Sequence, residues 1–309
     1  MPANILTITL NPTIDKSTEI GEIEPESKLR CGDIKNEPGG GGINVSKALK
    51  ELGCDSITLF PAGGNNGEML KSLLLKENIS FLSIPVENET RENFIVLETS
   101  TNKQYRFNLP GEATDIPIVE KVIDYISDNK FEYIICSGSL LPGMREDSYA
   151  LIANAAKNAG AKFILDTSGP ALKAAVEKGV YMLKPNIGEL ANMAGIKWLE
   201  PDQVETTARM LIDKGWVEII AVSMGKHGAV MVTKNESFKT IIPEMEKKST
   251  VGAGDSMVAG MVYMLSQKKP LCEVLRFGVA CGTAATMNAG TELFHKKTVF
   301  ELYERLKKS

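Results

Sequence analysis

Histidine is scarce in this chain, and its scarcity disfavours two common kinds of active site. The 309 residues include two histidines, His227 and His295, and neither stands in a recognisable motif with a nucleophilic serine or cysteine. A Ser/His triad and a metal site built from several histidines are therefore disfavoured. Any general base in this protein is expected to be a carboxylate.

The cysteines are few, and their arrangement argues against a disulfide framework or a zinc site. They are odd in number, widely scattered and without a C-x-x-C pair: Cys31, Cys54, Cys136, Cys272 and Cys281. This pattern is typical of a protein in a reducing compartment, and we expect a cytoplasmic location.

Long apolar runs and an excess of positive charge are missing as well. No run approaches the roughly 18–20 apolar residues of a membrane span, and the N-terminal segment does not resemble a signal peptide. The 35 basic and 39 acidic residues give a formal net charge of −4, which disfavours a dedicated nucleic-acid binder. No Walker A or protein-kinase signature is present. We therefore expect small-molecule partners, with no nucleic acid and no membrane.

Short runs rich in β-branched residues alternate with amphipathic segments along the chain. ILTITL at 5–10 predicts a strand, and INVSKALKELG at 43–53 predicts a helix that ends at Gly53. Similar alternation returns between residues 132 and 225. It indicates an α/β fold: a doubly wound, mostly parallel sheet with helices on both faces, whose ligands bind at the carboxyl ends of the strands. The length fits a single domain over residues 1–309.

Two segments interrupt this alternation, residues 14–36 and 91–109. Both are extended in pattern and contain turn residues, and neither has a helical period. We interpret them as two parts of one small β-layer beside the main sheet. The apolar face of such a layer must be covered. It would be covered if the layer closed as a lid over the active site, formed a dimer contact, or did both. An ordinary edge meander is the alternative.

Three stretches contain residue types suited to phosphates or nucleotides. PGGGGIN at 38–44 lets backbone approach a ligand where a Cβ would clash, although a flexible turn is the simpler interpretation. SMGKHGA at 223–229 follows a predicted strand and could wrap a nucleotide, but such turns are common. Asn186 and Glu189 in KPNIGE lie on one face of a helical turn. They could hold a hydrated Mg²⁺, or they could simply start a helix with a solvated glutamate.

The stretch KSTVGAGDSMVAG at 248–260 combines a glycine-rich turn with the start of a helix. Backbone N–H groups and the positive end of the helix dipole make such a place attractive to phosphate. The acidic Asp255 nevertheless stands in the first turn. A carboxylate beside an anion site requires a chemical explanation.

Taken together and in this order, GGGGIN, SGSLLPG, KPNIGE, SMGKHG and TVGAGD resemble the ribokinase-like family of sugar kinases, also called the phosphofructokinase-B family. The resemblance covers essentially the whole chain. It implies that Gly252, Ala253 and Gly254 form an anion hole and that Asp255 is the catalytic base. Backbone N–H groups would then stabilise the moving phosphoryl group while Asp255 takes the proton of the acceptor hydroxyl.

The resemblance also implies where the substrates bind. NPTID at 11–15 is similar to a motif of the phosphosugar branch. The implied sugar-phosphate residues are Asp15, Gly40, Gly41, Asn44, Arg91 and Ser139, and the small layer offers Lys28, Arg30 and Arg106 as further cations for a phosphate. The implied ATP site contains Lys184, Asn186, Ser223, Gly225 and Gly228. Glu189 would act on Mg²⁺ through water, and Ser249, Val251, Ala285, Asn288 and Gly290 would shape a K⁺ site.

The implied activity is ATP-dependent phosphorylation of fructose 6-phosphate at its 1-hydroxyl, a glycolytic reaction. Phosphorylation of tagatose 6-phosphate or of fructose 1-phosphate belongs to the same branch and remains open. A catalytically silent sensor of sugar phosphates or nucleotides is the non-enzyme alternative. ATP and Mg²⁺ are the implied cofactors; K⁺ is a further one, weakened by Glu292 where a basic residue is usual. We expect a homodimer that forms through the β-lid.

Overall fold

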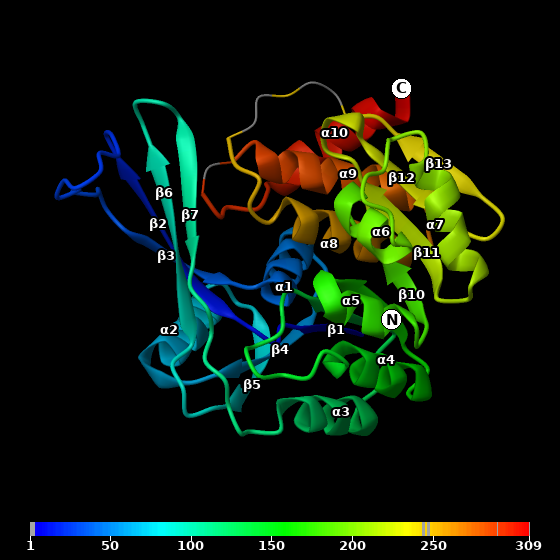
Figure 1. Ribbon diagram of the computed structural model, residues 1–309, viewed down its shortest axis with the longest axis horizontal. Helices are drawn as coiled ribbons and strands as arrows, with labels where there is room; N and C mark the ends of the chain where they lie inside the picture. Colours follow the sequence, from blue (N-terminus) through cyan, green and yellow to red (C-terminus); the bar gives the residue numbers. More distant parts are fainter. Residues whose placement is uncertain (1–3, 243–244, 246–247, 289, 309) are drawn as a thin grey trace.

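The structure, a computed structural model, describes residues 4–242, 245, 248–288 and 290–308 (Figure 1). Its centre is a nine-stranded sheet in the order β13-β12-β11-β10-β9-β8-β1-β4-β5. The strands are β1 Ile5–Ile8, β4 Ile57–Ala62, β5 Ser80–Pro85, β8 Tyr133–Ser137, β9 Lys162–Asp166, β10 Val180–Leu183, β11 Val217–Ser223, β12 Ala229–Val232 and β13 Ser237–Thr240. Neighbours are parallel except at β11–β12 and β12–β13. The predicted mostly parallel sheet is confirmed.

Helices cover both faces of this sheet. One layer contains α3 Ile118–Asp128, α4 Ser148–Asn158, α5 Gly169–Val176, α6 Ile187–Ala194 and α7 Val204–Asp213. The other contains α1 Gly41–Leu52, α8 Ala253–Ser266, α9 Leu271–Thr286 and α10 Lys296–Lys308. The helix α2 Gly64–Lys76 packs against a smaller apolar cluster beside β4. No helix in the described part of the chain is both long enough and apolar enough to span a membrane.

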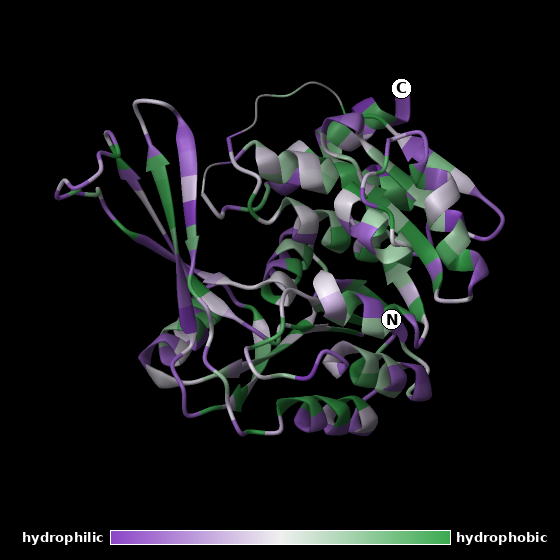
Figure 2. Cartoon of the chain, in the orientation of Figure 1, coloured by the Kyte–Doolittle hydropathy of each residue, from purple (hydrophilic) through white to green (hydrophobic). Residues whose placement is uncertain are grey.

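Side chains on the central strands alternate between the two layers. Phe163 and Leu165 of β9 belong to the core under α3–α7, whereas Ile164 belongs to the core under α8–α10. Strands buried on both faces have nearly continuous apolar sequences, which explains the short apolar runs along the chain. Figure 2 shows hydrophobic residues concentrated along these strands.

A second, four-stranded sheet has the order β3-β2-β6-β7. Its strands are β2 Thr13–Ile20, β3 Lys35–Gly39, β6 Arg91–Glu98 and β7 Lys103–Asn108, so the two predicted extended segments do form one small β-layer. β2 and β6 are parallel, and both outer pairs are antiparallel. This small sheet stands beside the main body (Figure 1).

The carboxyl ends of the parallel strands share one edge of the central sheet. The chain continues from β1 into the small sheet, from β8 into the loop after Ser137, and from β10 into α6. Parallel strands always present their carboxyl ends on a common edge, which is where α/β proteins bind ligands. The predicted site residues lie along this edge.

Candidate functional site

Asp255 lies in the first turn of α8. Gly252, immediately before the helix, has a φ of 69°, a left-handed conformation that glycine adopts without steric cost. The first N–H groups of a helix have no intrahelical acceptor, and the helix dipole adds positive potential there. The predicted Gly252–Gly254 anion hole is therefore at a place with free donors, beside a carboxylate.

The Asp255 carboxylate is fixed by two side chains from distant parts of the chain. The Ser137 hydroxyl donates to Oδ1 at 2.9 Å, and the Asn44 amide donates to Oδ2 at 3.0 Å. Ser137 ends β8, and Asn44 lies in the first turns of α1. Both carboxylate oxygens thus have a fixed direction in the site.

The pKa of Asp255 is raised to about 6, chiefly by burial. The nearby carboxylate of Asp166 contributes to this rise, while the hydrogen bonds from Asn44 and Ser137 oppose it because they favour the ionised form. At neutral pH the group is still mainly ionised, yet it is a stronger proton acceptor than an ordinary carboxylate.

A buried ion pair lies under the anion hole. Lys184 Nζ is 3.2 Å from Asp166 Oδ1, and a Cβ added at Gly254 would lie 3.3 Å from Lys184 Nζ. Burial alone would lower the pKa of Lys184, but the carboxylates of Asp166, Glu189 and Asp255 together outweigh it and the pKa is raised, so the amine stays charged. Lys184, predicted for the ATP site, therefore places a positive charge directly beside the anion hole.

Asp166 was not identified from the sequence. It ends the strand KFILD, and an acidic residue at the carboxyl end of a buried strand was the available signal. Ser137 was also missed, although it begins the SGSLLPG motif. Their roles depend on partners more than 15 residues away, which no local pattern contains.

The glycine run before α1 packs closely against the same group. Gly40 has a φ of 117°, and a Cβ added at Gly41 would lie 2.2 Å from Ser137 Oγ. Any side chain at position 41 would displace the hydroxyl that holds Asp255. The run is thus a tightly packed turn, and the simpler interpretation as a flexible one does not hold.

The sugar-phosphate residues predicted on the small sheet form a hydrogen-bonded cluster. Asp15 is buried and accepts from the Asn93 amide at 2.9 Å. Arg91 donates to Asn93 Oδ1 at 3.0 Å and to the Asn11 carbonyl at 3.3 Å. The Asn11 amide in turn donates to Ser139 Oγ at 3.1 Å, so two unpredicted asparagines connect three predicted residues.

Lys28 and Arg30 lie apart from this cluster. Both are exposed on the loop that joins β2 to β3 at the far end of the small sheet, and within the described residues neither has a hydrogen bond or ion pair. Arg106 of β7 instead reaches the main body, where it donates to Thr250 Oγ1 at 2.9 Å. A single chain therefore brings Arg91 and Arg106, but not Lys28 or Arg30, to the site.

The residues predicted for ATP meet at the carboxyl ends of β10 and β11. The N–H of Ser223 donates to the Pro185 carbonyl at 2.9 Å, and Ser223 forms an isolated bridge with Asn186. Gly225 begins the 3-10 turn η1 Gly225–His227, and Gly228 ends it. A Cβ at Gly228 would lie 1.9 Å from the Thr240 carbonyl oxygen, so this turn also requires glycine.

Asn186 and Glu189 form a capping box at the start of α6. Asn186 Oδ1 accepts from the Glu189 N–H at 2.9 Å, and Glu189 Oε2 accepts from the Asn186 N–H at 2.8 Å. The pair thus starts a helix, as the simpler interpretation stated, and it holds the Glu189 carboxylate near Asp166 and Lys184. Burial, with a contribution from Asp166, raises the pKa of Glu189.

The charge balance of the site fits a divalent cation bound with phosphates. Lys184 interacts electrostatically with three carboxylates, those of Asp166, Glu189 and Asp255. No group of three or more His, Cys, Asp or Glu side chains in the described residues is arranged to hold a metal directly. Mg²⁺ commonly keeps most of its bound water and is coordinated by phosphate oxygens. A site with more carboxylates than cations, but without a full set of protein ligands, is therefore suited to it.

The residues predicted for K⁺ come together between the end of α9 and the loop before α8. Ser249 Oγ donates to the Gly290 carbonyl at 2.8 Å, and the Val251 N–H donates to Ser249 Oγ at 3.2 Å. Ala285 lies in the last turn of α9, and the N–H of Asn288 donates to its carbonyl at 3.3 Å. The carboxyl end of a helix carries partial negative charge, which favours a cation.

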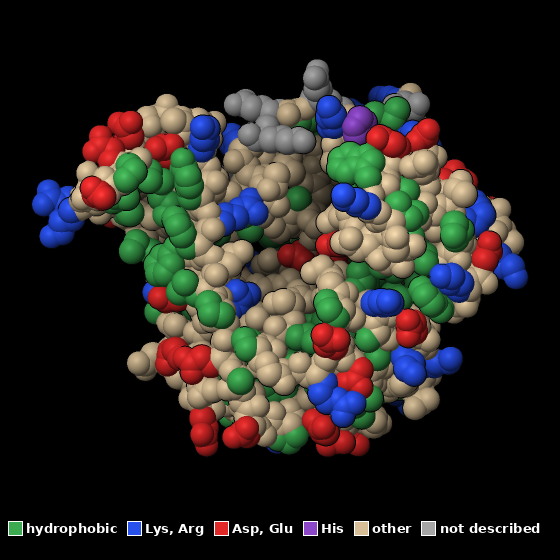
Figure 3. All heavy atoms as spheres, in the orientation of Figure 1, with side chains coloured by type: hydrophobic (Ala, Val, Ile, Leu, Met, Phe, Trp, Pro, Cys, Tyr) green, Lys and Arg blue, Asp and Glu red, His purple; other side chains and the backbone are tan. Residues whose placement is uncertain are grey.

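A hollow separates the small sheet from the main body. Figure 3 shows basic side chains on its rim and acidic side chains at its floor. The lining next to the small sheet includes Gln104, Arg106, Ser249 and Thr250. This arrangement can receive a phosphorylated ligand between the two sheets.

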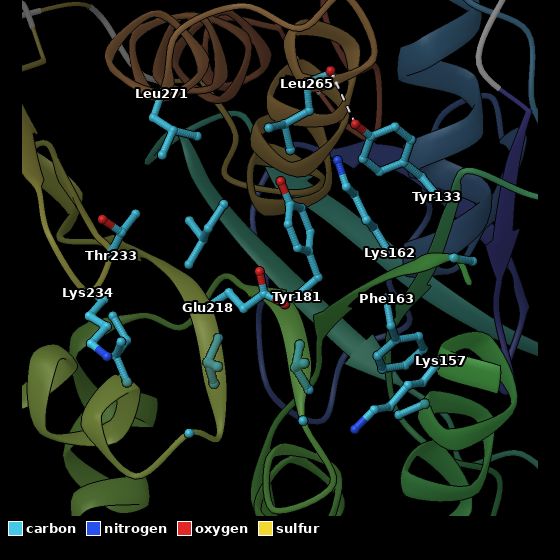
Figure 4. A pocket seen from close by; sticks show the side chains of 18 of the residues that line it. Tyr133, Lys157, Lys162, Phe163, Tyr181, Glu218, Thr233, Lys234, Leu265 and Leu271 are labelled. Carbon is cyan, nitrogen blue, oxygen red and sulfur yellow. Dashed lines mark hydrogen bonds between the residues drawn. The ribbon is translucent and has the colours of Figure 1, made fainter. Parts of the chain in front are cut away.

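A larger cleft, of about 1210 Å³, lies at the opposite edge of the central sheet. It is lined by the amino ends of β8–β11, and Figure 4 shows Lys162 rising between Tyr133 and Tyr181, 5.3 and 5.0 Å from their ring centroids. None of the predicted site residues lines it. Size alone therefore does not locate the site, because the buried Asp255, the Lys184–Asp166 ion pair and the glycine run before α1 are all at the other edge.

Comparisons with known proteins agree with this geometry. Residues 5–297 match the family described as pfkB family carbohydrate kinase. The chain is 38% identical over 307 residues to the ATP-dependent 6-phosphofructokinase isozyme 2 of Escherichia coli (strain K12), with 98% of each chain covered. It is 32% identical to a 1-phosphofructokinase of Borreliella burgdorferi, with 92% of each covered. A crystal structure of E. coli phosphofructokinase-2 in complex with potassium superimposes with a TM-score of 0.95 at 37% identity, covering 99% of both chains.

We predict that Asp255→Asn stabilises the fold in a pH-dependent manner. The folded-state pKa of about 6 lies above the ordinary pKa of 3.8 for an aspartate side chain, so keeping Asp255 ionised above pH 6 costs about 3 kcal/mol. The variant avoids this cost, and its advantage in free energy of unfolding should disappear as the pH falls from 6 to 4. Denaturant unfolding at pH 8 and pH 4 measures the difference. Asp128→Asn, at an exposed position, is the control. If Asp255→Asn changed the free energy of unfolding equally at both pH values, the raised pKa assigned to Asp255 would be contradicted.

Proposed function

Because the chain belongs to the pfkB family of carbohydrate kinases, we propose that it transfers the γ-phosphoryl group of ATP to the 1-hydroxyl of fructose 6-phosphate, giving fructose 1,6-bisphosphate and ADP. The observation that carries the proposal is the Asp255 carboxylate, fixed by Ser137 and Asn44 beside a helix N-terminus. The greater identity to 6-phosphofructokinase isozyme 2 than to 1-phosphofructokinase supports the choice of substrate. Residues 1–309 act as one catalytic unit, with the small sheet as its lid.

Asp255 acts as the general base. Its carboxylate accepts the proton of the sugar 1-hydroxyl as the hydroxyl oxygen bonds to the γ-phosphorus, and the bond from that phosphorus to the bridging oxygen breaks to release ADP. The pKa of about 6 lies close to neutral pH, which favours proton acceptance while the group remains ionised.

The anion hole stabilises the phosphoryl group during transfer. Negative charge on its oxygens faces the free N–H groups at the start of α8, which are preorganised and need no rearrangement. Lys184, buried beside Gly254, adds a fixed positive charge to the same place. Asn186, Ser223, Gly225 and Gly228 hold the nucleotide along the ends of β10 and β11.

Two cations complete the proposed site. Glu189 would hold Mg²⁺ through water, and the metal would neutralise charge on the ATP phosphates. Main-chain oxygens of Ser249, Val251, Ala285, Asn288 and Gly290 hold K⁺ next to the anion hole. The acidic surplus around Lys184 and the carbonyls at the end of α9 support these two assignments respectively.

The sugar phosphate binds between the small sheet and the glycine run. Asp15 accepts hydrogen bonds from sugar hydroxyls, and Gly40, Gly41, Asn44 and Ser139 surround the sugar. Arg91 pairs with the 6-phosphate. Its Nη1 donates to Asn93 Oδ1 and to the Leu109 carbonyl, and Nη2 donates to the Asn11 carbonyl. Within the described residues one N–H of Nη2 therefore remains as a donor for a ligand.

We predict that fructose 6-phosphate exceeds tagatose 6-phosphate, fructose 1-phosphate and fructose by tenfold or more in kcat/KM, about 1.4 kcal/mol. Initial rates of ADP formation with MgATP and K⁺ measure this. Arg91→Ala should lower kcat/KM for fructose 6-phosphate by about 10–100-fold, since a charge-assisted hydrogen bond is worth about 1.5–3 kcal/mol. The same substitution should leave kcat/KM for fructose unchanged. Arg305→Ala on α10 is the control. A lead by another hexose phosphate would move the proposal to tagatose-6-phosphate kinase or 1-phosphofructokinase, and binding without ADP formation would favour a sensor.

We predict that Asp255→Asn lowers kcat by at least about 10²–10⁴-fold, because an amide cannot accept the proton. KM for both substrates should change little, since the neutral amide keeps the shape of the carboxylate. In the parent enzyme kcat/KM should fall as the pH drops below about 6, the pKa of Asp255. Asp128→Asn should keep parental rates, and turnover near normal in Asp255→Asn would exclude the proposed base.

The outer face of the small sheet is proposed as a dimer contact. The strand register places Phe94, Val96, Tyr105 and Phe107 on the face opposite to Asp15 and Asn93, and Phe107 is 52% exposed. A second copy packed on this face would cover it.

Light scattering should therefore give twice the 33.6 kDa mass of one chain. Phe107→Asp should reduce the mass to that of a monomer, because it places a charge in the apolar contact. Phe300→Asp on α10 is the matched control and should leave the dimer intact. An active monomeric parent at assay concentration would contradict the dimer proposal and leave the catalytic one unaffected.

A further inference from the structure

Three contacts join the small sheet to the two loops next to the anion hole. On β7, Gln104 Oε1 lies 3.4 Å from Ser249 Oγ, and Arg106 donates to Thr250 Oγ1 at 2.9 Å. On β3, the Glu37 carboxylate accepts from the Thr291 hydroxyl. The third contact differs from the others because both partners are buried, with 8% and 5% exposure.

Glu37 lies two residues before Gly39, the first glycine of the run at the sugar site. A Cβ added at Gly39 would lie 2.3 Å from Asp15 Oδ2, and one at Gly41 would lie 2.2 Å from Ser137 Oγ. Such close packing leaves the run no freedom to shift independently. A displacement of Glu37 would therefore move the backbone that touches the groups holding the sugar and Asp255.

Thr291 lies directly after Gly290, at the other end of the contact. The Gly290 carbonyl accepts from Ser249 Oγ, and this carbonyl belongs to the proposed K⁺ site. A cation bound to these carbonyls would fix the position of Gly290, and with it the position of the Thr291 hydroxyl.

We propose that Glu37 is a positioning residue whose bond to Thr291 couples the cation loops to the sugar site. The inference rests on the proposed function and adds to it a mechanism by which K⁺ raises the affinity for the sugar phosphate. Occupancy of the cation site orders Thr291, Thr291 holds Glu37, and Glu37 holds the glycine run. By linkage the sugar phosphate raises the affinity for K⁺ by the same factor.

A purely structural role for this bond makes a different prediction. If the bond only stabilised the fold, its removal would lower the unfolding midpoint but leave the effect of K⁺ on sugar binding unchanged. The dissociation constant of the sugar phosphate is measured with and without K⁺, and the ratio of the two values distinguishes the coupling role from the purely structural one.

The test is isothermal titration of fructose 6-phosphate without nucleotide, in KCl and in tetramethylammonium chloride of equal ionic strength. The parent protein should bind at least about fivefold more tightly in KCl, the lower end of typical allosteric coupling. Thr291→Val should bring the ratio close to one, and Thr291→Ser, which keeps the hydroxyl, should restore it. Thr298→Val on α10 is the control and should keep the parental ratio.

Two results would overturn the proposal: a parental ratio of one, or a Thr291→Val ratio equal to that of the parent. If Thr291→Val does not fold, Glu37→Gln provides the measurement, because an amide oxygen accepts more weakly than a carboxylate and should lower the ratio. If fructose 6-phosphate does not bind in either salt, the proposed substrate fails first. The same titrations with tagatose 6-phosphate and fructose 1-phosphate then test the coupling, and binding of none of them would overturn both proposals.

Discussion

The site is organised around a carboxylate held at the start of a helix by two hydrogen-bond donors. Ser137 ends a central strand, Asn44 follows the glycine run, and Asp255 begins α8. These residues meet because the carboxyl ends of parallel strands share an edge, to which the following helices present their amino ends. The close approach of Gly41 to Ser137 then leaves little freedom for the loops. The positions of the residues proposed to bind the sugar and the nucleotide follow from this convergence.

The electrostatic arrangement around Asp255 balances opposing requirements. Burial and Asp166 make ionisation less favourable, whereas Ser137, Asn44 and Lys184 favour it. The result is a group ionised at neutral pH but close to its pKa, as general bases commonly are. Lys184 can remain charged in a buried place because Asp166 is 3.2 Å away. One ion pair thus maintains positive potential for phosphates and raises the basicity of the neighbouring carboxylate.

Much of the fold and the centre of the site could be predicted from local patterns. The alternation of apolar runs indicates the central sheet, because strands buried on both faces have few alternatives. Asp255 could be located since a glycine-rich helix start is contained in a few consecutive residues. The pairing of Lys184 with Asp166 could not, because it depends on β9 and β10 being neighbours. Likewise, their position within the extended segment 14–36 assigns Lys28 and Arg30 to the small β-layer, but their distance from Arg91 depends on strand register and loop length.

The order of strands in the central sheet has a consequence for synthesis of the chain. Beyond β1, strands β8 to β13 are added to one side of the sheet in the order in which they are translated. All nine strands exist once residue 240 has been made, but α8, α9 and α10 come later and form much of one core. A nascent chain therefore carries a nearly complete sheet with one apolar face largely uncovered until its last quarter emerges from the ribosome. Asp255 itself lies on α8, so the carboxylate at the centre of the site is added only after the whole sheet has been made.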